Sequence, residues 1–257
     1  MNKMQSVKIS VPDWCYYPKI GPAEAYYTTL KRLGVDAVEM VAPERYELAR
    51  AAGLAIINQS GPGMTEGLNR EENHPALLPQ IRAAIRQAAA NAVPLVIVFS
   101  GNRKDQPDGV GIENCRRGLE QLLPEAEQHR IVLGFEMLCE ANHPDYQASR
   151  SRYGFELCQT IGSPWLKVVY DIYHMQRSGE NTTSDVTANL AHIAHLHLAE
   201  SPQRSAPRAD GNIPYCQIVP AIAKAGYSDY WGLEYCPQSH PLLELEQSID
   251  MLRSLAS

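Results

Sequence analysis

The chain has 257 residues, 44% of them hydrophobic and 20% charged, and its formal net charge is -6 at pH 7. This composition is typical of a globular protein with a sizeable core, and it offers no basic stripe of the kind that binds nucleic acid. No uncharged apolar run is long enough to span a membrane, and the six cysteines are scattered without C-x-x-C pairs. Because the amino-terminal stretch also lacks the apolar segment of a secretory signal, we expect a cytoplasmic protein with reduced thiols.

Short runs rich in β-branched residues recur along the chain and predict eight strands. They lie at residues 7–12, 37–43, 54–60, 94–100, 131–137, 166–172, 193–199 and 230–235. Amphipathic patterns typical of helices cover residues 75–92, 112–129, 151–162, 184–194, 218–227 and 240–255.

Alternating strands and helices in a chain of this length predict an α/β protein, a (β/α)8 TIM barrel that forms a single domain over residues 1–257. A doubly wound open sheet is the alternative. It ordinarily needs fewer units, and no G-x-G-x-x-G follows the first predicted strand.

Three segments rich in Gly, Pro and Asn follow predicted strands, so in a barrel they share one face. The longest, residues 60–75, is long for a connection inside a compact barrel and is a candidate lid or binding loop. The others cover residues 100–111 and 199–215.

Polar side chains end four consecutive predicted strands: Glu136, Asp171, His197 and Glu234. In a (β/α)8 barrel the carboxyl ends of the strands converge on one mouth, where the active sites of this fold lie. The three carboxylates would repel one another there and would lose hydration, and a divalent cation bound by them and the imidazole would compensate that cost. Oxygen ligands with one imidazole suit Mn(II) or Mg(II), while Zn(II) and Co(II) stay open as alternatives.

Each of these residues also has an ordinary structural interpretation when it is taken alone. A carboxylate at a strand end often caps a helix or pairs with a cation, and a buried histidine often belongs to the core. His195 and His197 point to the same side of their strand, and His197 is the nearer of the two to the mouth. Glu39 and Asn58, near the ends of the second and third strands, are candidates to line the pocket.

The segments VVYDIYHMQ, HLHLAESPQR and WGLEY carry a resemblance to a known family. They resemble the hydroxypyruvate isomerase branch of the xylose isomerase-like barrel superfamily over residues 136–237, while the amino-terminal half is similar only in its rhythm of strands and helices. The resemblance implies one divalent metal ion on Glu136, Asp171, His197 and Glu234, with the two glutamates as the acid and base. It also implies that His174, in the loop after the sixth strand, and Arg204 contact the substrate.

The sequence departs from the isomerase branch at two places. That branch usually has Gln where this chain has His197, and GEINY where this chain has GNIPY. A His at position 197 is more like the sugar epimerase branches. These differences concern the substrate more than the fold or the metal.

The constellation predicts an enzyme that moves a proton next to a carbonyl through an enediolate. The resemblance implies an isomerase with hydroxypyruvate and tartronate semialdehyde as the expected pair. Arg204 would pair with the substrate carboxylate, although a solvated loop arginine is an equal alternative. Alternatives for the same metal site are a ketose 3-epimerase, another sugar isomerase and a dehydratase. A phosphodiesterase resembling endonuclease IV is disfavoured because Glu39 and Asn58 stand where it would need histidines. A barrel without activity and association into a homo-oligomer stay open.

Overall fold

A computed structural model describes residues 7–256. These residues form two compact units, one made of residues 7–57, 182–190 and 195–256 and the other of residues 58–181 and 191–194. The stretch searched for a secretory signal lies partly outside the described residues. The prediction of one domain over residues 1–257 stays a prediction.

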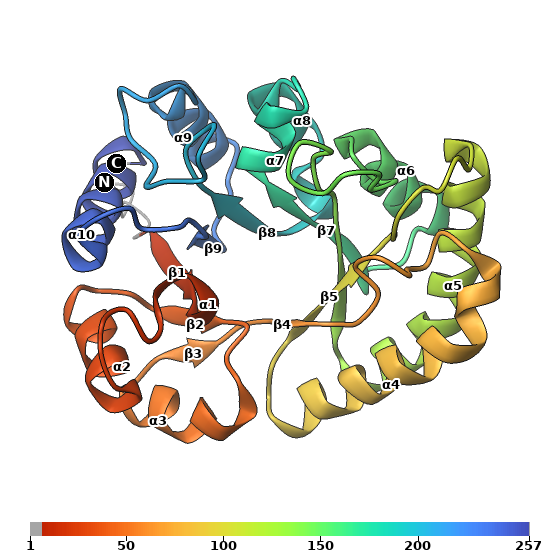
Figure 1. Ribbon diagram of the computed structural model, residues 1–257, viewed down its shortest axis with the longest axis horizontal. Coiled ribbons are helices and arrows are strands. Elements are labelled where there is room, and N and C mark those ends of the chain that lie inside the picture. The colour runs from red at the N-terminus through yellow and green to blue at the C-terminus, as the bar shows by residue number, and fades with distance from the viewer. Residues whose placement is uncertain (1–6, 257) are drawn as a thin grey trace. The chain divides into compact units, whose positions relative to one another are not determined.

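The first unit is built on parallel strands in the order β3-β2-β1-β9-β8 (Figure 1). The strands are β1 (Lys8–Pro12), β2 (Ala37–Glu39), β3 (Ala55–Ile56), β9 (Tyr230–Leu233) and β8 (Ile193–Leu198), the last from residue 195 on. Its helices are α1 (Asp13–Tyr16), α2 (Ala23–Arg32), α3 (Tyr46–Ala51), α8 (Thr182–Ala188), α9 (Tyr215–Lys224) and α10 (Pro241–Leu255).

The second unit is built on parallel strands in the order β7-β6-β5-β4. They are β4 (Gln59–Ser60), β5 (Leu95–Phe99), β6 (Val132–Glu136) and β7 (Leu166–Asp171). The helices of this unit are α4 (His74–Ala90), α5 (Asp108–His129), α6 (Ser151–Ile161) and α7 (Ile172–Arg177), of which α4, α5 and α6 pack in sequence order beside the strands (Figure 1). Short 3-10 helices η1 (Pro43–Arg45), η2 (Glu71–Asn73) and η3 (Leu190–His192) complete the description.

The third predicted strand, residues 54–60, is two short strands rather than one. β3 pairs with β2 through Ile56, whereas β4 pairs with β5, where Gln59 lies opposite Val96. Residues 57 and 58 belong to neither ladder, and the two units divide between them. The apolar run LAII continues up to this break, so hydrophobicity alone does not reveal it.

The strands read as apolar runs because they are covered on both faces, as is usual in parallel sheets. All five residues of β5 are buried, and so are residues 133–136 of β6 and 168–171 of β7. Each covering helix buries one stripe: in α6 the buried residues include Tyr153, Phe155, Leu157 and Cys158. That helix ends at Gly162, whose positive φ of 66° suits glycine.

Residues 60–75, the predicted lid, are tied to their own unit by several hydrogen bonds. Asn69 donates from Nδ2 to the Asn102 carbonyl oxygen and to Gln147 Oε1, at 2.7 Å each, and Arg70 Nη2 donates to two neighbouring carbonyl oxygens, of Arg103 and Lys104. The role of this segment as a lid stays a prediction. None of the helices within residues 7–256 is both long and apolar enough to cross a membrane.

Candidate functional site

Glu234 follows directly after β9 and is held by three neighbours in the first unit. Trp14 Nε1 donates to its Oε1 at 3.0 Å, and Arg204 Nη2 donates to its Oε2 at 2.6 Å. His197 Nδ1 lies 3.0 Å from the same Oε2. Only 5% of the Glu234 surface is exposed, so its charge is balanced by the Arg204 guanidinium rather than by water.

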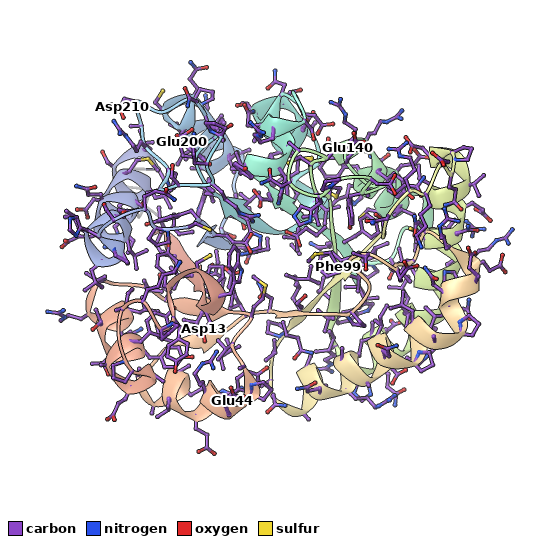
Figure 2. The ribbon with its side chains drawn as sticks, viewed as in Figure 1. Asp13, Glu44, Phe99, Glu140, Glu200 and Asp210 are labelled. Carbon is purple, nitrogen blue, oxygen red and sulfur yellow. The ribbon has the colours of Figure 1, made fainter. Side chains whose placement is uncertain are left out.

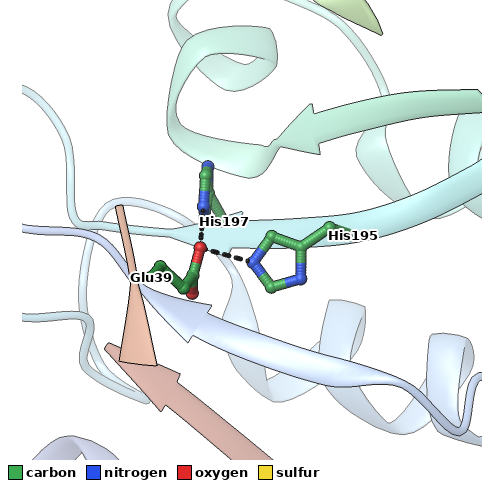
Figure 3. A group of neighbouring side chains, drawn as sticks. All are labelled: Glu39, His195 and His197. Atoms are coloured by element: carbon green, nitrogen blue, oxygen red, sulfur yellow. Dashed lines mark hydrogen bonds and ion pairs between the residues drawn. The ribbon is translucent and has the colours of Figure 1, made fainter. Parts of the chain in front are cut away.

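His197 lies near the end of β8 and is fully buried, and its second ring nitrogen faces another carboxylate. Nε2 lies 2.8 Å from Glu39 Oε2, and His195 Nε2 lies 3.0 Å from the same oxygen (Figure 3). Ser10 Oγ donates to the other oxygen, Glu39 Oε1, at 2.6 Å. Burial by itself raises the pKa of Glu39, but the two imidazoles outweigh it and hold that pKa well below its usual range.

The strand register explains how Glu39 on β2 reaches β8. Ser10 on β1 lies opposite Gly232 on β9, and Gly232 lies opposite His197 on β8. A Cβ atom on Gly232 would lie 2.7 Å from atoms of Glu39, His195 and His197, so only glycine leaves room for the cluster. Three strand spacings amount to about 14 Å along a flat sheet, which is beyond the reach of a Glu and a His side chain. The sheet of this unit is therefore curved toward the side that carries the cluster.

Glu136 and Asp171 end neighbouring strands of the second unit. Glu136 pairs with Val169, two residues before Asp171, and both carboxylates are buried. The Tyr146 hydroxyl donates to the backbone oxygen of Glu136 at 3.0 Å, which anchors the end of β6. Asp171 is also a helix cap, because its Oδ1 accepts from the backbone N–H of His174 at 3.3 Å. The cap therefore occupies one carboxylate oxygen of Asp171, Oδ1.

His174 lies on a helix, α7, and not in a loop as predicted. The segment IYHMQR contains no Gly or Pro, and the Asp171 cap begins the helix directly after β7. The ring is buried, with Nε2 at 3.5 Å from Asp171 Oδ2. Nδ1 lies 3.2 Å from the Sγ atom of Cys139 and 3.4 Å from its backbone nitrogen. Cys139 was missed from the sequence, where only its place three residues after Glu136 pointed to it.

Arg204 belongs to the loop after β8, the segment between Glu200 and Asp210 (Figure 2). Its guanidinium lies 5.5 Å from the centre of the Trp14 ring, and only 15% of its side chain is exposed. Glu200 supports the same loop, since its Oε1 accepts from the backbone nitrogens of Ser201 and Ile213 at 2.8 and 3.0 Å. The loop is thus fixed by a buried carboxylate at its base.

The predicted site residues fall into two groups when each unit is considered by itself. The structure brings His197, Glu234 and Arg204 together in the first unit, and it brings Asp171 and His174 together in the second. The separation of His197 Nδ1 from Glu234 Oε2 fits a divalent ion, because two ligands about 2.0–2.2 Å from one ion at right angles lie about 3 Å apart. The buried His and Glu side chains are therefore consistent with a metal site.

Comparison with known proteins yields named relatives. The chain is 31% identical to the hydroxypyruvate isomerase of Escherichia coli K12 over 164 residues, which is 62% of either chain and so less than two thirds of that relative. It is 26% identical to the 2-oxo-tetronate isomerase of Cupriavidus necator over 223 residues, which is 80% of this chain and 84% of the relative.

A solved structure and a family model agree on the fold. The crystal structure of the D-psicose 3-epimerase of Clostridium cellulolyticum H10 with D-tagatose superposes with a TM-score of 0.81 at 16% identity, and the match covers 98% of this chain and 100% of that one. The model of the xylose isomerase-like TIM barrel matches residues 28–255. These two findings confirm the predicted (β/α)8 barrel. The chain belongs to the xylose isomerase-like TIM barrel family.

Proposed function

We propose that this protein is a metal-dependent isomerase of small hydroxy-carbonyl compounds, and that it interconverts hydroxypyruvate and tartronate semialdehyde. The observation that carries the proposal is the buried pair of His197 Nδ1 and Glu234 Oε2, 3.0 Å apart at the ends of adjacent strands. The likeness to the E. coli and C. necator isomerases supports the same reaction class.

In this proposal Glu136, Asp171, His197 and Glu234 hold one divalent cation, with Mn(II) or Mg(II) as the first choice. All four side chains are buried, and each lies at or next to the end of a strand. The bound ion would supply positive charge that polarises the substrate carbonyl and lowers the barrier by several kcal/mol.

Glu136 and Glu234 act as the base and the acid. One carboxylate removes the proton from the carbon next to the carbonyl, and the other returns a proton to the former carbonyl carbon of the enediolate. The hydroxyl proton of the first carbon passes to the former carbonyl oxygen, and proton exchange with solvent resets both carboxyl groups. A positioned proton-transfer group contributes about a hundred- to ten-thousand-fold in rate. Burial suits both carboxylates for this task, because it keeps competing water away from the transferred proton.

His174 and Arg204 bind the substrate. The backbone N–H of Cys139 points to His174 Nδ1, which leaves Nε2 as the nitrogen that carries the proton and can donate to a substrate oxygen. The Arg204 guanidinium, which holds Glu234 Oε2, is planar and forked and can pair with the carboxylate of a 2-oxo acid.

The test removes metal with a chelator, restores Mn(II) or Mg(II), and follows exchange of the α-carbon proton by NMR. Hydroxypyruvate, tartronate semialdehyde and a panel of ketoses are compared. We expect metal-dependent exchange with the first two compounds. Exchange with ketoses alone would favour a 3-epimerase, and no metal-dependent exchange with any compound would refute the proposal.

Two variants sharpen this test. Glu136→Gln should abolish exchange because the amide cannot take up the proton. Glu140→Gln is the matched control, since Glu140 lies four residues later and 59% of its side chain is exposed. Full activity of the Glu136→Gln variant would remove this residue from the mechanism.

A further inference from the structure

We propose that Glu39 is the positioning residue of His197: it accepts a hydrogen bond from Nε2 and so leaves Nδ1, on the side of Glu234, to offer its lone pair to the metal ion. This inference rests on the proposed function, because it takes His197 to be a ligand of the metal ion. It assigns a role to a buried carboxylate that neither transfers a proton nor contacts the substrate in that proposal.

The chemistry of the imidazole requires such a partner. A neutral imidazole has one N–H and one lone pair, and only the nitrogen with the lone pair can bind a cation. His197 places Nε2 at 2.8 Å from Glu39 Oε2 and Nδ1 at 3.0 Å from Glu234 Oε2. A carboxylate accepts hydrogen bonds only, so the proton of His197 belongs on the nitrogen that faces whichever carboxylate stays free of metal. Glu39 is that carboxylate.

Glu39 itself is fixed on several sides. Ser10 donates to Oε1, while Oε2 receives His197 and lies 3.0 Å from His195 Nε2 (Figure 3). The next residue, Met40, has a positive φ of 49°, a conformation that costs a non-glycine residue about 1 kcal/mol or more. This backbone turn ends β2 directly after Glu39. The carboxylate is therefore held in one place by its neighbours and by the backbone.

The three residues Glu39, His195 and His197 could also be arranged around a cation of their own. His197 would then have to bind one ion through each nitrogen, and its ring would have to lose both protons. A neutral ring that donates from Nε2 to Glu39 needs no such deprotonation, and it leaves one ion on Nδ1. The number of ions bound per chain separates the two arrangements.

The experiment compares the wild type with Glu39→Gln and with a matched control, Ser10→Ala. The control removes the hydrogen bond to Oε1 but keeps the bond between Oε2 and His197. Titration calorimetry with Mn(II) should show a dissociation constant about 10–100-fold higher for Glu39→Gln, as is typical when the outer partner of a ligating histidine is lost. Ser10→Ala should change it by less than about tenfold.

A second measurement does not depend on the metal. The ¹⁵N NMR shifts of the His197 ring in the metal-free wild type should show a proton on Nε2, with or without a second proton on Nδ1, because Nδ1 also faces a carboxylate when no ion is bound. Glu39→Gln should lower the protonation of Nε2. Thermal melting of each variant checks that the fold is intact. If Glu39→Gln fails to fold, the wild-type spectrum still decides the question.

The results distinguish this inference from the proposed function. Unchanged Mn(II) affinity in Glu39→Gln, a wild-type Nε2 without a proton, or two ions bound per chain would each overturn the positioning role. Absence of any Mn(II) or Mg(II) binding by the wild type would instead remove the proposed function, and the tautomer of His197 would still test what Glu39 does to the ring.

Discussion

Replacing Gly232 by alanine tests the packing of the cluster around His197. The added Cβ would lie 2.7 Å from Glu39 Oε1, from His195 Nε2 and from His197 Cδ2. None of these atoms can move away at little cost, because all three side chains are buried and tied together through Glu39 Oε2 and the Ser10 hydroxyl. The methyl group must therefore push a histidine ring or the carboxylate out of position.

The expected loss of stability combines two effects. Overpacking a filled interior costs about 1–3 kcal/mol. Loss of the hydrogen bond from His197 to an anionic acceptor costs about 1.5–3 kcal/mol. We expect Gly232→Ala to lower the free energy of unfolding by at least about 2 kcal/mol. In a chain of this size that corresponds to a melting temperature lower by about 4–8 °C.

Urea denaturation followed by circular dichroism measures the change. Gly109→Ala in α5 is the control, because its Cβ would meet nothing within 4 Å and alanine has the higher helix propensity. That control should equal or exceed the wild type in stability. If Gly232→Ala unfolds within about 0.5 kcal/mol of the wild type, the cluster is looser than its distances imply and the argument from the strand register fails.

Three further predictions follow from other parts of the chain. Glu244→Ala should lower the free energy of unfolding by about 0.5–2 kcal/mol, because Glu244 accepts from the backbone nitrogens of Gln238, Ser239 and His240 before α10. Although burial raises the pKa of Glu244, these hydrogen bonds outweigh it and lower the pKa below 4.5. The stabilisation is therefore complete above about pH 4.5 and is lost as the pH falls through the lowered pKa. The difference in unfolding free energy between wild type and Glu244→Ala should thus be smaller at pH 3 than at pH 7. A thiol reagent at pH 8 should modify the exposed Cys216 quickly and leave Cys115 and Cys158 unmodified in the folded protein, because burial raises the pKa of both to about 12; mass spectrometry that finds equal rates would contradict the burial. Mn(II) at a hundred times its dissociation constant should stabilise the chelator-treated protein by about 2.7 kcal/mol, and a melting temperature that does not respond to Mn(II) or Mg(II) would contradict the metal site.

The sequence predicted the strands well where an apolar run ends in a polar residue. Apolar runs ending in Glu136, Asp171 and His197 predicted strands β6, β7 and β8 to within a residue or two. These runs are bounded by polar or turn residues, and their buried faces leave little freedom of register. The roles of the four strand-end residues in binding a metal ion stay a prediction.

Other features depend on contacts between segments far apart in the chain. No local pattern reveals that Glu39 reaches His197 past β1 and β9, because that approach depends on sheet curvature and on the missing side chain of Gly232. Arg204 is similar: its sequence context allows a solvated loop residue, but the fold places it against Glu234 and Trp14. The short helix α7 was missed because its six residues carry too little periodicity to be recognised.

The ion pair between Arg204 and Glu234 has a consequence for how the protein would take up a metal ion. Glu234 Oε2 is already paired with the Arg204 guanidinium. A metal ion bound there would replace one positive charge with another rather than neutralise an unpaired carboxylate. The affinity for the metal ion would then reflect the difference between binding the ion and binding Arg204 at Glu234. It should weaken less with added salt than the affinity of a carboxylate cluster that has no cationic partner. In the proposed function, the same exchange would free the guanidinium for the substrate carboxylate only in the metal-loaded protein.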